Sequence, residues 1–225
     1  MSNVNSDTST ARDAILGRIR ASKPAGDQPP RPPVPQVWPP ADPTTGQMAE
    51  QFVESLEAVA GEVVRCQSMD DAKAALAEMV EREGWTSLGI VEKPDCSEVV
   101  ADLPAETVTT VDENIEPRQM AEFAAGIIAP EHLLADTGSC MIVCPTGEHR
   151  LMCYLPPVCI IVAHEEQLVE TMPAAWGKVS AASSAKDLTG EYVFITGPSR
   201  TADIEKILIL GVHGPKRVIV LLVRG

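Results

Sequence analysis

The chain has 225 residues, 44% of them hydrophobic, which is enough to bury one sizeable core and favours a single domain with extensions. Its formal net charge of -14 argues against a large nonspecific nucleic-acid surface, because phosphate backbones are bound by clustered Lys and Arg. The N-terminus lacks the pattern of a secretory signal, and no apolar run approaches the roughly 18 residues that span a bilayer. We therefore expect a cytoplasmic protein that binds neither nucleic acid nor membrane.

The N-terminal part of the sequence divides into a helix and a tether. Ile15 and Ile19 lie on one side of a short amphipathic pattern, which predicts a helix within residues 1–23 that docks a partner. Repeated prolines across residues 24–44 predict an extended tether, and a plain spacer is favoured there over a PxxP recognition ligand. Residues 45–225 are expected to form a single α/β domain.

Helical and strand patterns alternate through the first half of this domain, which is typical of a mainly parallel sheet covered by helices. Phe52 and Leu56 belong to one buried helical face, and Ser68 and Gly84 are suitable residues to begin and end the next helix. The elements expected to follow that first face are a strand at 63–66, a helix at 69–83, strands at 87–91 and 107–111, a helix at 120–125 and a strand at 124–128.

The middle of the domain contains polar turns. Pro130 favours a short helix at 130–135, followed by a polar turn at 136–139 and a strand at 141–144. A turn at 145–149 would fold the chain back toward Arg150 as an antiparallel pair. The fold class is therefore predicted as α/β with a mixed, mainly parallel sheet.

The most informative segment is the apolar run that starts at Tyr192, because a polar turn follows it. Such a run predicts a strand buried on both faces in a parallel sheet, with a helix opening near Thr201 and a buried strand at 218–223. The turn at 196–201 would then face the crevice where ligands bind in such sheets. A turn of this composition is suited to an anion, since Gly197 allows close approach, Pro198 stiffens the backbone and a helix N-terminus attracts negative charge.

Arg200 favours the same interpretation, because a guanidinium can make a two-pronged contact to a carboxylate or phosphate. A structural role fits the local pattern equally well. Ser199 or Thr201 would then cap the helix, Asp203 would complement its dipole, and Arg200 would pair with Asp203 or Glu205. Neither GxxxxGK[ST] nor GxGxxG occurs, so the sequence gives no motif for a nucleotide cofactor.

The six cysteines are expected to be reduced thiols in the core, because a chain of this length without a secretory signal is not expected to need a disulfide framework. Four of them fall between Cys140 and Cys159, yet no CxxC or ferredoxin-like spacing occurs. We therefore expect no metal site and no cofactor in this chain, and any iron–sulfur chemistry would belong to a partner.

Two segments carry a resemblance to a known family. Residues 196–205 (TGPSRTADIE) and 211–215 (GVHGP) resemble the C-terminal signature of the lactate-utilization protein C family, also called LUD-domain proteins. Residues 135–139 and 150–157 resemble its central elements. The resemblance implies a fold like that of sugar-phosphate isomerases and coenzyme A transferases, and a part in oxidising L-lactate to pyruvate beside iron–sulfur oxidoreductase subunits. It also implies that the turn at 136–139 lies near the same pocket as the turn at 196–201.

Candidate roles follow from these expectations. His213 is the candidate base for the lactate hydroxyl, although a hydrogen bond that fixes its loop is the favoured use. Arg150 is a candidate partner for a substrate carboxylate. The predicted ligand-binding residues are Asp136, Thr137, Gly138, Ser139, Arg150, Thr196, Gly197, Pro198, Ser199, Arg200, Thr201, Asp203 and Gly214.

Two classes of function fit the sequence. In the first, the chain is a non-redox component of a lactate-oxidising assembly that binds a small carboxylate or phosphate. In the second, it is a stand-alone enzyme of the sugar-phosphate isomerase or acyl coenzyme A transferase type. The second class requires a carboxylate nucleophile, for which Glu205 is the candidate near the turn.

Overall fold

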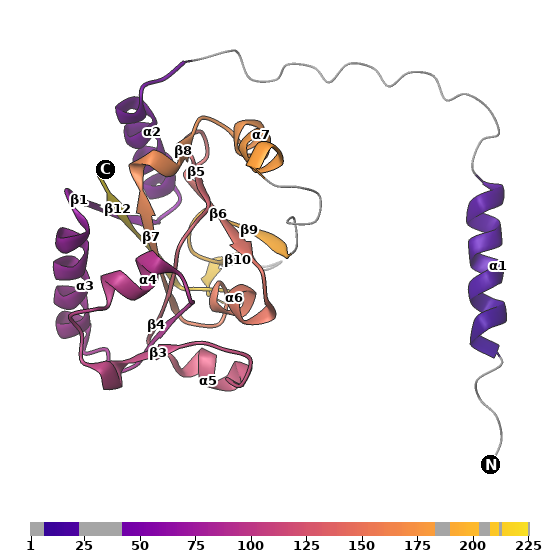
Figure 1. Cartoon of the computed structure of the whole chain (residues 1–225), viewed down its shortest axis with the longest axis horizontal. Helices are drawn as coiled ribbons and strands as arrows, with labels where there is room; N and C mark the ends of the chain where they lie inside the picture. Colours follow the sequence, from indigo (N-terminus) through magenta and orange to yellow (C-terminus); the bar gives the residue numbers. More distant parts are fainter. Residues whose placement is uncertain (1–6, 23–41, 183–189, 203–207, 212, 225) are drawn as a thin grey trace. The chain divides into compact units, whose positions relative to one another are not determined.

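The computed structural model of the chain describes residues 7–22, 42–182, 190–202, 208–211 and 213–224 (Figure 1). The chain divides into two compact units, Met1–Ala41 and Asp42–Gly225. The first unit contains helix α1 (Asp7–Ala21), as the pattern around Ile15 and Ile19 predicts, and both isoleucines are exposed. Most of the predicted tether lies outside the described residues, so its conformation remains a prediction.

The second unit contains a six-stranded sheet in which every neighbouring pair of strands is parallel. The three longest apolar strands are buried along nearly their whole length, with none of the alternation of a half-exposed strand. The sheet is therefore wholly parallel, where the sequence indicated a mixed one. In their order across the sheet the strands are β1 (Glu62–Cys66), β12 (Arg217–Val223), β7 (Val158–His164), β4 (Ala125–Ile128), β2 (Leu88–Ile90) and β3 (Val108–Thr110).

Local sequence signals account well for the first helices of this unit. Helix α2 (Thr45–Ala58) begins with a capping box between Thr44 and Gln47 and buries Phe52 and Leu56 completely. Helix α3 (Met69–Glu83) begins after Ser68, whose hydroxyl accepts a hydrogen bond from the Asp71 N–H, and ends at Gly84 in the left-handed conformation. The remaining helices are α4 (Pro94–Val99), α5 (Pro117–Glu122), α6 (Gly147–Met152) and α7 (Met172–Ala182), with 3-10 turns at Ala105–Thr107 and Glu165–Gln167.

A second, four-stranded sheet is mixed and has the order β8 (Leu168–Val169), β5 (His132–Leu134), β6 (Ser139–Cys144) and β9 (Glu191–Ile195). Strand β6 is antiparallel to both β5 and β9, whereas β5 is parallel to β8. The short helix predicted at 130–135 is wrong, because Leu133 and Leu134 are buried in β5 by pairing with β6. The turn predicted at 145–149 is also wrong, since α6 follows β6 there and Arg150 lies inside that helix.

The largest correction concerns the segment that starts at Tyr192. Strand β9 pairs antiparallel with β6 instead of joining the parallel sheet, and residues 200–202 form strand β10 (Arg200–Ala202), which pairs with β11 (Leu208–Leu210). The predicted helix opening near Thr201 is therefore wrong. The predicted burial on both faces is correct for one face only, because Val193 and Ile195 are buried whereas Tyr192 and Phe194 are partly buried. Val193 and Ile195 join the main core, while Tyr192 and Phe194 pack in a smaller cluster beside Trp176 of α7.

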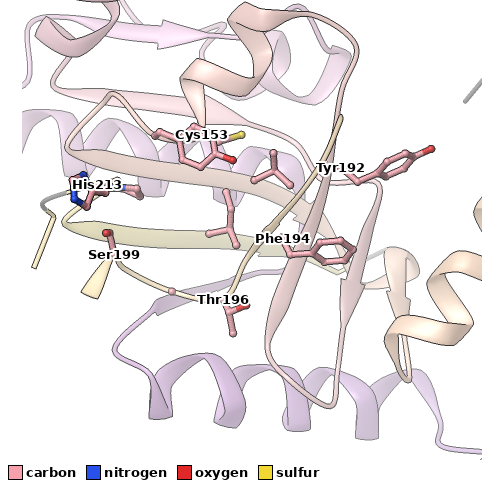
Figure 2. A pocket seen from close by; sticks show the side chains of 12 residues that line it. Cys153, Tyr192, Phe194, Thr196, Ser199 and His213 are labelled. Carbon is pink, nitrogen blue, oxygen red and sulfur yellow. The ribbon is translucent and has the colours of Figure 1, made fainter. Parts of the chain in front are cut away.

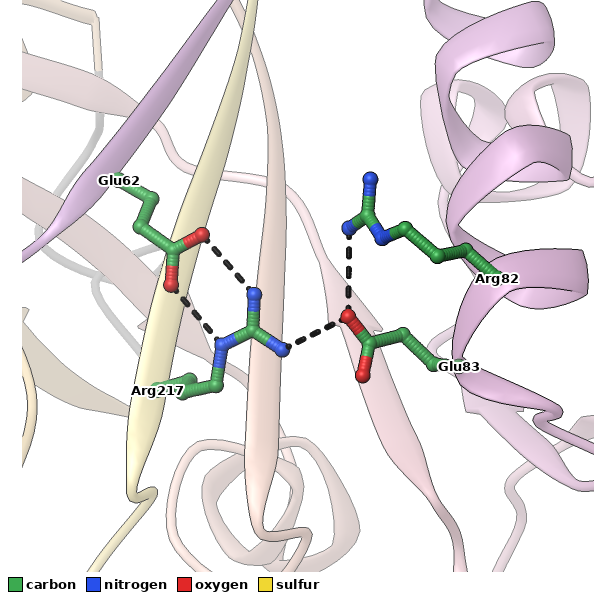
Figure 3. A network of polar contacts seen from close by, with 4 residues as sticks. All are labelled: Glu62, Arg82, Glu83 and Arg217. Carbon is green, nitrogen blue, oxygen red and sulfur yellow. Dashed lines mark hydrogen bonds and ion pairs between the residues drawn. The ribbon is translucent and has the colours of Figure 1, made fainter.

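A polar network joins the amino ends of two parallel strands to α3 (Figure 3). The Arg217 guanidinium, at the start of β12, donates to both carboxylate oxygens of Glu62 at 2.9 Å and to Glu83 at 3.4 Å. Arg82 donates to the same Glu83 carboxylate at 3.2 Å. Because a two-pronged guanidinium contact restricts direction as well as distance, this network stabilises the amino ends of β1 and β12.

Candidate functional site

A pocket of about 270 Å³ lies between the small mixed sheet and the parallel sheet (Figure 2). Its walls come from three places in the sequence. Cys153 and Tyr154 follow helix α6, residues 192–197 and 199 come from β9 and the turn after it, and residues 213–215 precede β12.

Strand β9 contributes its edge to this pocket. Within the described residues β9 pairs with β6 alone, and the pocket is lined by six consecutive residues from Tyr192 to Gly197. Successive side chains of a strand point to opposite faces, so an uninterrupted run of lining residues indicates that the pocket follows the strand edge. In Figure 2 the Tyr192 and Phe194 rings point away from Ser199 and His213, which agrees with their packing beside Trp176.

The pocket lies at the amino ends of the parallel strands. Tyr154 is a few residues before β7, and Pro215 is two residues before β12. The expectation that the turn at 196–201 faces the crevice at the carboxyl ends is therefore wrong. The physical reason is the antiparallel pairing of β9 with β6, which places the end of β9 beside the starts of β7 and β12.

Backbone hydrogen bonds hold the two parts of the C-terminal signature together. The Ser199 N–H donates to the Pro215 carbonyl at 2.9 Å, and the Gly211 N–H donates to the Ser199 carbonyl at 2.9 Å. A Cβ added at Gly214 would lie 3.1 Å from Ser199 Cβ, which is tighter than ordinary contact. The turn after β9 and the loop before β12 therefore form one wall of the pocket, with Ser199 and His213 in it.

A chain of hydroxyls leads from this wall to the polar turn before β6. Thr196 Oγ1 and Ser139 Oγ share a hydrogen bond of 2.8 Å, and Ser139 Oγ and Thr137 Oγ1 share another of 2.8 Å. Ser139 is buried, whereas Thr137 and Thr196 are exposed. The structure thus brings the turn at 136–139 to the turn at 196–199, as the family resemblance implies, although only Thr196 of these three hydroxyls lines the pocket.

Asp136 precedes this hydroxyl chain and is only partly exposed. Its N–H donates to the Glu170 carbonyl at 3.2 Å, while its Oδ1 is buried and has no hydrogen-bond partner within the described part of the chain. Its predicted role in ligand binding is unsupported by any contact with the pocket.

The C-terminal end of α2 supports both polar turns. Gly138 has a positive φ of 63°, and a side chain there would collide with the backbone of Leu56. Gly197 has a φ of 127°, and a Cβ there would lie 3.2 Å from the Val59 carbonyl oxygen. Arg200 donates from its guanidinium to that same carbonyl, at the end of a helix where a cation is favoured.

Several predicted site residues are therefore placed elsewhere. Arg200 contacts a helix terminus and not the pocket, and Thr201 lies in β10, so no helix N-terminus is available at 200–202 to bind an anion. Arg150 donates to Glu191 at 2.7 Å as an exposed ion pair. Asp203 and Glu205 lie outside the described residues, so their predicted roles are not placed. Pro198 lies in the turn between Gly197 and Ser199.

Tyr154 and Lys216 are polar residues near the pocket that were not predicted from the sequence as site residues. A second hollow of about 510 Å³ shares Tyr154, His213 and Gly214 with the first and adds Lys216, together with Ala121, Leu155, Pro157 and Gly211. Burial raises the pKa of Tyr154, so its phenol remains a hydrogen-bond donor at neutral pH. Tyr154 lies inside the family-like segment 150–157, and Lys216 directly follows the family-like segment 211–215. This placement was the signal that the sequence offered for both residues.

The arrangement offers three hydroxyl groups, an imidazole and a lysine among the described residues. Ser199, Thr196 and Tyr154 supply hydroxyls, His213 supplies an imidazole, and Lys216 supplies a positive charge in the adjoining hollow. Within the described ranges no group of three or more His, Cys, Asp or Glu side chains could hold a metal ion. The site is therefore suited to a small polar molecule that carries a negative charge.

The architecture defines an α/β protein with a parallel sheet and a small mixed sheet, and a solved structure shares it. The crystal structure of a DUF162 family protein from Deinococcus radiodurans superposes with a TM-score of 0.55 at 17% sequence identity, covering 82% of this chain and 100% of that one. At this identity the likeness concerns the fold alone.

Sequence comparison then identifies the family. The LUD domain profile matches residues 49–223, and the chain therefore belongs to the LUD-domain family. Lactate utilization protein C of Bacillus pumilus is 30% identical over 113 residues, which are 50% of this chain and 46% of that protein. Lactate utilization protein C of Halalkalibacterium halodurans is 33% identical over 46% of this chain and 44% of that protein.

A third relative covers more of the domain. The protein YkgG of Escherichia coli is 28% identical over 72% of this chain and 74% of its own length. The matches to the Bacillus and Halalkalibacterium proteins span less than half of their lengths, so the activity of those whole proteins does not transfer directly. Among the residues described, no helix is both long and apolar enough to cross a membrane.

Proposed function

We propose that the chain is a non-redox component of an L-lactate utilization system, which binds a small carboxylate or phosphate and assembles with iron–sulfur oxidoreductase subunits in the cytoplasm. The observation that carries the proposal is the wall formed by the two signature segments, because the residues that mark the family are also those that build the pocket. The names of the relatives supply the lactate context.

The chemistry of the pocket favours a small hydroxy acid or a phosphate. A volume of about 270 Å³ is at the lower end of what drug-sized ligands occupy, so a molecule of a few carbon atoms is the better match. Ser199 and Thr196 can donate to oxygen atoms of such a molecule, and Lys216 can balance its charge from the adjoining hollow. His213 is exposed beside Ser199 and is the candidate to accept a proton from a substrate hydroxyl.

A stand-alone transferase or isomerase receives less support. That function depended on an anion cradle at the start of a helix, but residues 200–202 form β10. Glu205 lies outside the described residues, so its role as a nucleophile stays a prediction and counts neither for nor against this alternative. Binding without independent turnover is therefore the function that the geometry supports better.

A ligand screen tests the binding half of the proposal. L-lactate, pyruvate and inorganic phosphate should be titrated into the full chain while its melting temperature is followed, since a ligand that prefers the native state raises that temperature. We expect a rise with at least one of these anions. The variant Lys216→Gln should weaken the rise several-fold, whereas Lys178→Gln, an exposed lysine on α7, should leave it unchanged. No rise with any anion would contradict the proposed pocket.

A pull-down tests the assembly half. The exposed Ile15 and Ile19 give α1 an apolar stripe that suits docking to another protein. Iron–sulfur oxidoreductase subunits from the same organism should co-purify with the full chain and be lost from the double variant Ile15→Asp, Ile19→Asp. A double variant Arg12→Asp, Arg18→Asp on the same helix is the control for charge alone. Failure of the wild-type chain to retain any such subunit would refute the assembly.

A further inference from the structure

Two cysteines meet at the pocket wall. Cys144, at the end of β6, and Cys153, directly after α6, have their sulfur atoms 4.0 Å apart. Both side chains are buried, yet Cys153 also lines the pocket, where Figure 2 shows it beside the strand edge. The proposed anion-binding function uses neither thiol.

The other cysteines differ from this pair. All six cysteines are buried in the same core, but among the described residues no hydrogen bond joins the sulfur of Cys66, Cys96, Cys140 or Cys159 to another thiol. The hydrogen bond between the two thiols lowers the pKa of Cys144 and raises that of Cys153, so Cys144 is the thiol of the pair that ionises more readily. Within the described residues no third side chain joins the pair to make a metal site. Two thiols in contact, one of them at a cavity, are therefore suited to oxidation and not to metal binding.

We propose that Cys144 and Cys153 form a reversible redox pair, which a hydroperoxide small enough to enter the pocket converts to a disulfide. The sulfur atoms must approach by about 2 Å to reach the length of an S–S bond. Cys153 directly follows α6, a helix of only six residues, where its thiol donates to the His149 carbonyl at 3.4 Å and its N–H donates to the Arg150 carbonyl at 3.0 Å. The end of this short helix must therefore shift with Cys153.

The chemistry balances in two steps with hydrogen peroxide as the oxidant. Cys144 Sγ attacks one peroxide oxygen, the O–O bond breaks, and the leaving oxygen takes the Cys144 thiol proton and departs as water. Cys153 Sγ then attacks the resulting sulfenic sulfur of Cys144, the S–S bond forms, and the hydroxyl departs as water with the Cys153 proton. The two sulfur atoms lose two electrons in total, and the two peroxide oxygens gain them.

Oxidation would change the pocket. Moving Cys153 toward β6 also moves its neighbour Tyr154, which lines both hollows. If the proposed anion site is correct, the oxidised chain should bind its anion several-fold more weakly than the reduced chain. This consequence rests on the proposed function, whereas formation of the disulfide does not.

The test is to expose the reduced full chain to hydrogen peroxide and measure its intact mass, its free thiols and its peptide map. We expect a mass loss of two hydrogen atoms, loss of two of the six thiols, and a crosslinked peptide that joins residues 144 and 153, all reversed by dithiothreitol. Glutathione disulfide, which is too bulky for a pocket of about 270 Å³, should react far more slowly.

Variants separate this pair from incidental oxidation. Cys153→Ser should abolish the crosslink and leave Cys144 as a sulfenic acid that dimedone traps, whereas Cys96→Ser should form the crosslink at the wild-type rate. Circular dichroism of each variant verifies that it is folded. Crosslinking of any other pair, or retention of all six thiols at peroxide concentrations that leave the fold intact, would overturn the proposal. A crosslink in a chain that shows no anion-dependent melting shift would leave the redox pair standing and refute only the anion site.

Discussion

The six-stranded parallel sheet and the four-stranded mixed sheet relate to the sequence in different ways. Continuous apolar runs mark β7 and β12, and these strands lie side by side at the centre of the parallel sheet. In the mixed sheet, β5 has the composition of a short helix and β9 has that of a parallel strand, yet both pair antiparallel with β6. Apolar composition therefore reports burial, while the direction of the partner strand depends on contacts far away in the sequence. The pocket is lined by β9, so its position depends on the antiparallel pairing of β9 with β6.

The largest effect should come from the centre of the parallel sheet. Leu221 is completely buried in β12, so Leu221→Ala should lower the free energy of unfolding by about 2–5 kcal/mol through lost burial and an unfilled cavity. Urea unfolding followed by circular dichroism measures this change. Ile19→Ala, at an exposed position of α1, is the control and should change the unfolding free energy little. A cost below about 1 kcal/mol at Leu221 would mean that this sheet does not dominate stability.

A smaller effect is expected at Gly138, in the turn before β6, where the chain packs against α2. Gly138→Ala combines a positive φ with a collision against the Leu56 backbone, and it should lower the free energy of unfolding by about 1–3 kcal/mol. Gly147→Ala is the matched control, because a Cβ there meets open space. Equal stability of the two variants would show that α2 does not confine the turn at 136–139.

A still smaller change in the free energy of unfolding is expected from the hydrogen-bonded hydroxyls of Thr137, Ser139 and Thr196. Ser139→Ala removes the buried link between Thr137 and Thr196 and should lower the free energy of unfolding by about 1 kcal/mol. If the proposed anion site depends on the orientation of Thr196, the anion-dependent melting shift should fall as well. Ser180→Ala, at an exposed position of α7, is the control and should affect neither measurement.

The smallest effect concerns pH. Burial, followed by the nearby charge of Lys178, lowers the pKa of His132 in β5 below its ordinary value of 6.5, so the unfolded chain takes up a proton here more readily than the folded chain. The contribution of this residue is therefore fully present above pH 6.5 and is lost as the pH falls through that value. Because His132 is partly exposed, the loss should stay below about 1 kcal/mol. His132→Gln should flatten the decline of melting temperature between neutral and mildly acidic pH, and an unchanged decline would contradict this assignment.

The sequence predicts those parts of the fold that local signals determine. Both ends of α3 follow from Ser68 and Gly84, and the strand before it and the strand at the C-terminus follow from apolar runs. Residues 200–202 also carry helix-start signals, but their pairing with residues 208–210 prevails. The two paired segments are close together in the sequence, so the helix-start signals are outweighed by pairing with a neighbouring segment.

The candidate site shows the same limit. The family resemblance correctly brings the turns at 136–139 and 196–199 together, and Ser139 contacts Thr196 across 57 positions of sequence. Local reasoning assigned Arg200 to an anion or a nearby carboxylate, whereas it contacts Val59, 141 residues earlier. Tyr154 and Lys216 were missed because each becomes part of the site only when β7 and β12 start beside the end of β9.

The C-terminal end of α2 packs against the turns that contain Gly138 and Gly197. This packing limits where the domain can gain or lose residues during evolution. Inserting one residue within α2 would rotate everything beyond the insertion by about 100° and advance it by about 1.5 Å. The Val59 carbonyl would then turn away from Arg200, and the backbone of Leu56 would no longer pack against Gly138. Insertions and deletions should therefore be tolerated ahead of Thr45 and rejected between Thr45 and Val59.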